Sequence, residues 1–153
     1  MPKAPFNVAT ANDSPGLLLW QTTILWQRQI KKALDPYGIA HAQFVILAIL
    51  LWLDTQHQEP TQTLLAHWSK LDKMTVSKSL KKLAALNLVA RLEHTQDTRA
   101  KNVTLTAKGK KLTCQLVPII EATDQLFFGK ISQNNKQHLL KIFKQLTTND
   151  APS

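Results

Sequence analysis

Cysteine is almost absent from this sequence, because Cys114 is the only one among 153 residues. A disulfide within the chain is therefore excluded, and the composition fits a reducing compartment, so we expect a cytoplasmic protein. Glycine is nearly as scarce, with four residues. The sequence has no glycine-rich phosphate-binding loop, no Gly-x-Ser-x-Gly element and no metalloprotease motif. We therefore expect no enzymatic activity.

Long hydrophobic runs are missing as well. The longest, residues 44–53, has ten residues, which is too short to cross a bilayer and suits a buried helix. The first residues lack the charged-then-apolar pattern of a signal sequence, so we expect no membrane association. The five histidines are scattered and form no close ligand pair with one another or with Cys114. We therefore expect neither a metal nor a cofactor.

Acidic residues are few: ten Asp and Glu stand against nineteen Lys and Arg, and the formal net charge is +9. Residues 70–111 hold eleven of the basic residues and three of the acidic ones. Nearly all the excess charge thus lies in one segment, which favours a polyanionic partner. A charged surface that serves only solubility is the alternative.

Capping and turn residues predict helices in the N-terminal part. Ser14 as N-cap and Pro15 after it start a first helix, which ends before the turn signal at residues 35–38. Residues 41–54 are apolar almost all round. They therefore predict a second helix at the centre of the core.

A helix-turn-helix pattern follows. A short helix at residues 62–69 is separated by a tight turn from a second helix, which Asp72 can cap and which runs to about residue 86. Three apolar residues of that second helix share one face and are expected to pack inward: Val76, Leu80 and Leu83.

Two short strands come next, at residues 88–92 and 102–105. Asn87 precedes them at the end of the helix, where Asn tolerates the left-handed conformation that closes helices. The turn between the strands, residues 95–101, is polar and basic. The hairpin is therefore expected to project as a wing.

The remainder is predicted to be helical. Thr106 can cap a long helix, Pro118 is expected to kink it, and Gly129 to end it. Ser132 can cap a last helix. Helices at both ends of the chain carry apolar stripes, which predicts a homodimer in which the two copies pack against each other. Packing of these stripes within one chain is the alternative.

Three groups of residues carry a resemblance to a known family. In chain order they are Leu65-Ala66 with Asp72-Lys73-Met74-Thr75-Val76-Ser77-Lys78; Leu83 with Leu88-Val89 and Arg91; and Asp97, Arg99, Val103, Leu105, Thr106 and Gly109. They resemble the helix-turn-helix, the helix-to-strand passage and the wing of the MarR family of bacterial winged-helix regulators.

The resemblance implies a mainly α fold with a small β-hairpin wing, a winged helix-turn-helix. It implies one domain over residues 1–153, with a DNA-binding lobe at about 55–106 and dimerisation helices at about 14–36 and 107–148. It further implies a dimeric repressor that binds specific double-stranded DNA sequences and responds to a small molecule. A winged-helix module that binds an acidic protein or has an architectural role is the alternative function.

The sequence departs from the family pattern at three positions. Asn87 stands where the family usually has glycine, and Lys70 stands where the turn of the helix-turn-helix often has glycine. Thr98 stands where many members have a second arginine. Binding is therefore expected to be weaker or less dependent on the wing than the family pattern suggests, with more of it contributed by the helix.

Helical spacing and the resemblance together assign candidate DNA contacts. Residues near the start of the second helix of the motif are expected to meet base edges: Thr75, Ser77, Lys78 and Ser79. Further lysines of that helix are expected to hold phosphates: Lys73, Lys81 and Lys82. In the wing, Arg99 can enter a narrow minor groove, Asp97 can orient an arginine, and Lys101 adds a cation. Solubility, capping or an ordinary surface ion pair is the alternative role for these residues.

Members of the family often bind small aromatic molecules between the dimerisation helices and the DNA-binding lobes. Four aromatic residues are candidates for such a pocket, and core packing is the alternative for each: Trp20, Trp26, Phe44 and Trp52. Cys114 lies in the fifth predicted helix, slightly off its apolar stripe. The sequence leaves a redox role for Cys114, the operator, the effector and the sign of regulation undecided.

Overall fold

The computed structural model of the protein describes residues 4–93 and 101–148. Six α-helices and one β-hairpin lie in these ranges, with short 3-10 turns at Ala11–Asp13 and Asp35–Tyr37. The elements in chain order are α1 (Pro15–Leu34), α2 (His41–Thr55), α3 (Gln62–Ser69), α4 (Lys73–Ala85), β1 (Val89–Glu93), β2 (Lys101–Leu105), α5 (Ala107–Phe128) and α6 (Gln133–Thr148). The expected class, mainly α with a hairpin wing, is confirmed.

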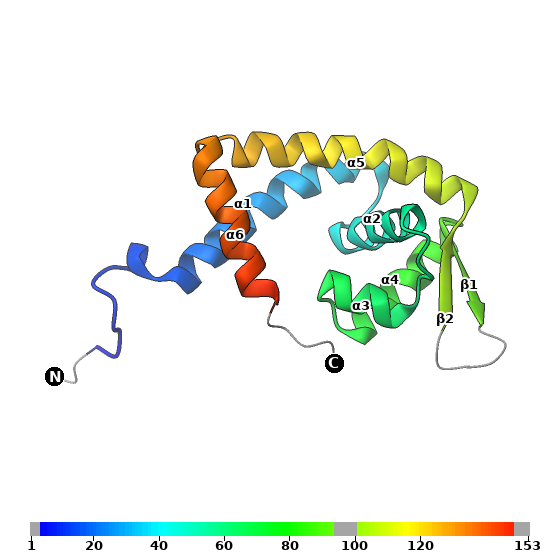
Figure 1. The fold of residues 1–153 in the computed structure, drawn as a ribbon, viewed down its shortest axis with the longest axis horizontal. Coiled ribbons are helices and arrows are strands. Elements are labelled where there is room, and N and C mark those ends of the chain that lie inside the picture. The colour runs from blue at the N-terminus through cyan, green and yellow to red at the C-terminus, as the bar shows by residue number, and fades with distance from the viewer. Residues whose placement is uncertain (1–3, 94–100, 149–153) are drawn as a thin grey trace.

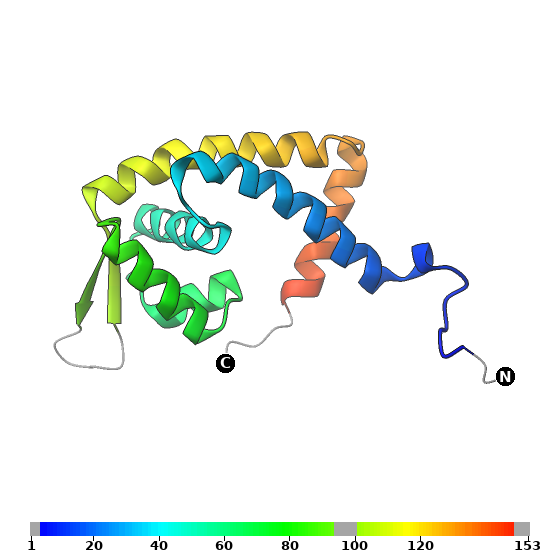
Figure 2. The same ribbon diagram turned by 180° about the vertical axis from the view of Figure 1, so that it is seen from behind.

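Two long helices organise the molecule. Figures 1 and 2 show α1 and α5 side by side, with α2 beneath them and with α3, α4 and the hairpin forming a lobe at the hairpin end of α5. At its other end α5 is followed by α6, which turns away from it, and the N-terminal segment extends beyond the start of α1 (Figure 1). The N-terminal segment before α1 and the helix α6 therefore lie outside the lobe that carries the hairpin.

The core is centred on α2, as its sequence predicts. Its buried side chains, among them Ile46, Leu47 and Leu50, lie in one cluster with residues of α1, α3, α4, β2 and α5. Leu34 and Leu116 are fully buried members from α1 and α5. The lobe is therefore attached to the long helices through α2.

Local hydrogen bonds start the helices where the sequence predicts. The Ser14 hydroxyl accepts from the Leu17 N–H at 3.2 Å, and the Thr61 hydroxyl accepts from the Leu64 N–H at 3.1 Å. Ser132 caps α6 in the same way. Each of these bonds satisfies an amide that the first helical turn leaves without a partner.

The passage from α4 to α5 depends on two special positions. Asn87 has φ of 60°, the predicted left-handed conformation. The Thr106 hydroxyl donates to the Asn87 carbonyl at 2.6 Å and accepts from the Gly109 N–H at 3.0 Å. A Cβ on Gly109 would lie 1.9 Å from the Leu88 carbonyl oxygen, so α5 can approach the strand only because residue 109 is glycine.

Pro118 lies inside α5, which continues from Ala107 to Phe128. Gly129 follows as the C-cap, as predicted, with φ of −70°. In the part of the chain that the structure describes, no single helix is long and apolar enough to span a membrane. One pair, α1 with its following turn and α2, passes the length and composition criteria together but is bent by 80°.

Candidate nucleic-acid interface

The turn between α3 and α4 has a left-handed residue without glycine. Lys70 has φ of 60°, and its N–H donates to the Ala66 carbonyl at 2.9 Å. The Ser69 hydroxyl accepts from the Leu71 N–H at 3.2 Å. A lysine therefore adopts here the left-handed conformation that glycine often provides in this turn. This conformation is unfavourable in energy for lysine, because its Cβ lies close to the following carbonyl oxygen.

Asp72 caps α4 with both carboxylate oxygens. Oδ1 accepts from the Thr75 N–H at 2.7 Å, and Oδ2 accepts from the Thr75 hydroxyl at 2.9 Å. The bond from the Thr75 backbone, with that from the Thr75 side chain next, lowers the pKa of Asp72 below its ordinary value. The carboxylate is therefore ionised at neutral pH, at the helix end that favours negative charge.

The outward face of α4 is basic. Its lysines are exposed: Lys73, Lys78, Lys81 and Lys82. Thr75 and Ser77 are half-exposed, and Met74 is the most exposed large apolar side chain of the helix. Val76, Leu80 and Leu83 are buried, as predicted. The helix thus presents cations and two hydroxyl side chains beside an apolar inner face.

The structure contradicts the prediction that Ser79 meets a base edge. That role requires a position on the outward face of α4, but the residue is only 8 % exposed. Position 79 lies three residues after Val76 and four before Leu83, so helical periodicity places it on the inward stripe. Ser79 therefore cannot meet a base edge in this arrangement.

Arg91 of β1 makes an internal contact, unlike the exposed lysines of α4. Its guanidinium nitrogen Nη2 donates to the Ser77 carbonyl at 2.8 Å, and its Nε is buried without a hydrogen-bond partner among the described residues. Val89, two residues earlier on β1, is buried. Strand alternation puts Arg91 on the same face as Val89, toward α4. This alternation is the signal that identifies Arg91 as an internal contact.

The base of the hairpin is anchored to the segment before α3. Antiparallel pairing sets Arg91 opposite Val103 and Glu93 opposite Lys101. The Val103 N–H donates to the Pro60 carbonyl at 3.0 Å, and the Asn102 amide donates to the Glu59 carboxylate at 2.8 Å. The wing residues Asp97 and Arg99 lie outside the described residues, as does the side chain of Lys101.

The four aromatic candidates for an effector pocket lie in different surroundings. Trp20 is 66 % exposed on α1, whereas Phe44 is buried in the core. Trp26 donates from Nε1 to the Asp124 carboxylate at 2.8 Å and packs edge-on against His41. Trp52 packs edge-on against Trp68 of α3, with ring centroids 5.1 Å apart. Among the described residues, Trp26 and Trp52 thus contact different partners.

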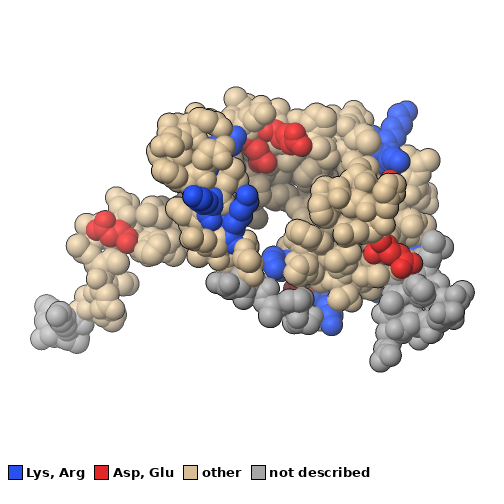
Figure 3. Space-filling model, in the orientation of Figure 1, with Lys and Arg blue, Asp and Glu red and all other residues tan. Residues whose placement is uncertain are grey.

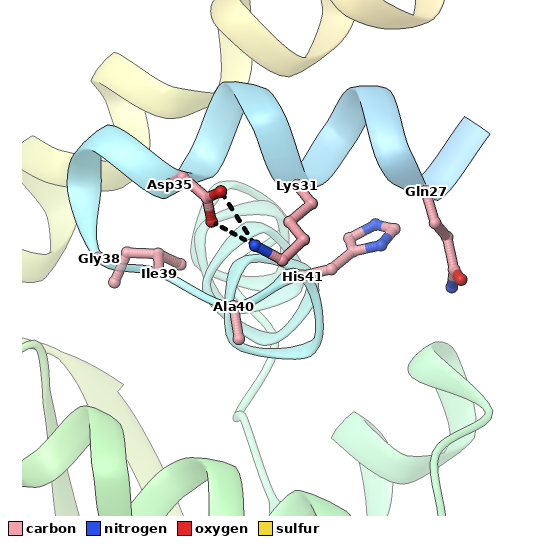
Figure 4. Close-up of a pocket in the computed structure, with 7 residues that line it drawn as sticks. All are labelled: Gln27, Lys31, Asp35, Gly38, Ile39, Ala40 and His41. Atoms are coloured by element: carbon pink, nitrogen blue, oxygen red, sulfur yellow. Dashed lines mark hydrogen bonds and ion pairs between the residues drawn. The ribbon is translucent and has the colours of Figure 1, made fainter. Parts of the chain in front are cut away.

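A hollow of about 450 Å³ lies where α1 meets the start of α2. Figure 4 shows Gln27, Lys31 and Asp35 above it on α1 and His41 on α2. Lys31 and Asp35 form an ion pair at 2.9 Å. Burial lowers the pKa of His41, and the nearby Asp124 carboxylate opposes that shift. The hollow is thus bordered by one cation, Lys31, one carboxylate, Asp35, and the polar side chains of Gln27 and His41.

Positive charge extends beyond the helix-turn-helix. Figure 3 shows Lys and Arg on its visible face over α6 as well as at the edge of the lobe. Within the described ranges, no three His, Cys, Asp or Glu side chains come close enough to hold a metal ion. Cys114 is exposed on α5.

Comparison with known proteins decides the family. An ArnR1-like winged-helix domain matches residues 35–123. An uncharacterised HTH-type transcriptional regulator of Bacillus subtilis, YdcH, is 36 % identical over 118 residues, which cover 77 % of this chain and 80 % of that one. This chain belongs to the MarR family of winged helix-turn-helix regulators. It is a DNA-binding transcriptional regulator.

Solved MarR-family relatives share the complete fold. Bordetella bronchiseptica BpsR, whose DNA binding is regulated by 6-hydroxynicotinic acid, superposes with a TM-score of 0.82 at 22 % identity, over 94 % of this chain and 99 % of that one. Staphylococcus aureus MepR in complex with DNA gives a TM-score of 0.77 at 25 % identity, over 88 % and 98 %. The similarity therefore includes the long helices as well as the lobe.

Proposed function

We propose that this MarR-family protein is a homodimeric repressor that places α4 of each protomer in the major groove of a two-fold symmetric operator. The observation that carries the proposal is the outward face of α4, with four exposed lysines around Thr75 and Ser77. A helix of this size fits the major groove, where hydroxyl side chains can reach base edges and lysines can reach phosphates.

The roles of the proposed contact residues differ. Thr75, Ser77 and Lys78 belong to the first half of α4, where recognition helices meet bases. Lys73, Lys81 and Lys82 provide phosphate contacts, which raise affinity for every sequence. Arg99, with Asp97 and Lys101, supplies the wing contact to the minor groove in this proposal. Ser79 takes no part, because it is buried.

The domain organisation follows from the same proposal. Residues from about 55 to 106 form the DNA-binding lobe, and residues 14–36 and 107–148 supply the dimerisation helices. The outer half of α1 exposes Leu17, Leu18 and Trp20, and α6 contains no buried residue although it carries apolar side chains. An exposed apolar surface of this extent is typical of a protein interface.

A small effector is proposed to act at the hollow between α1 and α2. Its volume falls in the range of about 300–1,000 Å³ that ligand sites occupy. Lys31 can pair with an anionic group of the effector, the neutral His41 imidazole can donate a hydrogen bond to it, and the Trp26 ring supplies an aromatic neighbour beside His41. Because α2 carries the lobe, a ligand between α1 and α2 would change the spacing of the two recognition helices.

The deciding experiment is selection of bound duplexes from a random pool with the full-length protein. We expect a two-fold symmetric site whose half-sites are about one helical turn apart. We also expect a steep loss of affinity as salt increases, because several phosphate contacts release counterions. An absent or asymmetric sequence preference would favour the alternative, a winged-helix module that binds protein or has an architectural role.

A further inference from the structure

The hydroxyl proton of Thr75 already has an acceptor within the protein. Thr75 Oγ1 lies 2.9 Å from Asp72 Oδ2, and its backbone N–H donates to Asp72 Oδ1 at 2.7 Å. The two bonds bind both carboxylate oxygens to one residue. The hydroxyl is therefore held in one orientation before any DNA arrives.

The direction of this hydrogen bond is determined by charge. The pKa of Asp72 is lowered by the same two bonds, so the carboxylate is ionised at neutral pH and has no proton to donate. Thr75 must be the donor. A threonine hydroxyl has one proton and two acceptor lone pairs, so only lone pairs and the methyl group remain for other partners.

We propose that Thr75 reads the operator as a hydrogen-bond acceptor, so that the base facing it is one with an exocyclic amino group, adenine or cytosine. The inference rests on the proposed placement of α4 in the major groove. In that groove adenine N6 and cytosine N4 are donors, whereas guanine offers only the acceptors N7 and O6 and thymine only O4; adenine also has the acceptor N7. Asp72 thus determines specificity through Thr75 without contacting a base.

Two substitutions separate the roles of the two residues. Thr75→Val keeps the shape and the methyl group but removes the acceptor. Asp72→Asn keeps the cap, because Asn and Asp are equally good N-caps. Its amide oxygen can accept from the Thr75 N–H while its NH₂ group donates to Thr75 Oγ1. The hydroxyl proton is then free to point toward the DNA.

The experiment is duplex selection with the wild type and both variants at the same salt concentration. Thr75→Val should lose its preference at one position of each half-site, which identifies the base pair that Thr75 reads. The wild type should prefer adenine or cytosine there on one strand by about tenfold, within the range of a single mismatched pair. Asp72→Asn should shift that preference toward guanine or thymine on the same strand, because these bases offer only acceptors at their major-groove edge apart from the thymine methyl.

Loss of the Asp72 charge has a second effect that serves as a control. Removing a carboxylate near phosphates raises affinity for all sequences alike, since phosphate electrostatics carry no sequence information. A uniform gain without a shift toward guanine or thymine in Asp72→Asn would overturn the inference. An unchanged position profile in Thr75→Val would also overturn it. A wild type without any sequence preference would instead contradict the proposed function.

Discussion

Asn87 shows how one residue joins the recognition helix to the wing. Its left-handed backbone lets α4 stop and β1 start within a few residues, and the Leu88 N–H that follows donates to the Leu83 carbonyl at 2.9 Å. The carbonyl of Asn87 in turn accepts from the cap of α5. The conformation of this residue therefore determines how three elements meet.

Substitution of Asn87 should separate conformation from side-chain chemistry. We expect Asn87→Ala to lower the free energy of unfolding by about 1 kcal/mol, because a Cβ without the local hydrogen bonds of Asn is disfavoured at positive φ. Asn87→Gly should be at least as stable as the wild type in urea unfolding. Lys78→Ala, at an exposed position within α4, is the control. Equal losses in the Ala and Gly variants would contradict this account.

At the scale of elements, α4 and the hairpin form one unit. Arg91 of β1 bonds to the middle of α4 through the Ser77 carbonyl, and Pro60 and Glu59 hold the other strand. A hydrogen bond from a charged donor contributes about 1.5–3 kcal/mol when its partners are sheltered from water. The angle between α4 and the hairpin is therefore maintained by a residue whose guanidinium faces α4.

Arg91→Met should test this positioning role. The apolar stem is retained but the bond to Ser77 is lost, so we expect affinity for the selected operator to fall about tenfold, or about 1.4 kcal/mol. The slope of log affinity against log salt should not change, because no phosphate contact is removed. Lys78→Ala or Lys82→Ala should lower that slope by about 0.9 if the lysine contacts a phosphate.

Arg91→Lys provides the matching rescue, since an ammonium group can also donate to a carbonyl. It should recover part of the lost affinity. A decrease of the salt slope in Arg91→Met, to the extent seen in the lysine variants, would show that Arg91 contacts phosphate itself. Thermal unfolding of each variant identifies any loss that comes from misfolding.

At the scale of the whole molecule, the apolar surface lies at the end remote from the wing. The exposed faces of α1 and α6 contrast with the buried core around α2, and Figure 1 places both helices at that end. A homodimer through these faces would leave both α4 helices free for DNA. Dimer geometry would then determine the spacing of the half-sites.

A double variant of α6, Phe143→Asp with Leu146→Asp, should dissociate the dimer. Leu146 is 71 % exposed, and no residue of α6 is buried in the protomer. Helical content should therefore persist while sedimentation shows a monomer, and affinity for a two-half-site operator should fall at least tenfold. Lys141→Asp, on the opposite face of α6, is the control. A dimer that survives the double variant would place the interface elsewhere.

Local chemistry made much of the fold predictable. The caps at Ser14, Asp72 and Thr106 and the helix end at Asn87 are bonds or conformations within a few residues, so their signals lie in the adjacent sequence. The apolar spacing of α4 predicted its inner face for the same reason. The Asp72 cap at the start of the basic helix α4 could therefore be predicted without knowledge of any tertiary contact.

The sequence by itself thus determined the order of elements, the charge of the recognition segment and the family. Only the tertiary structure decided which groups meet across elements. The Arg91 guanidinium bonds to the Ser77 carbonyl, Trp52 packs against Trp68 and Trp26 bonds to Asp124, because each contact depends on what another element places opposite it. The partner of a side chain is a non-local property, and periodicity within one segment gives only the face on which that side chain lies.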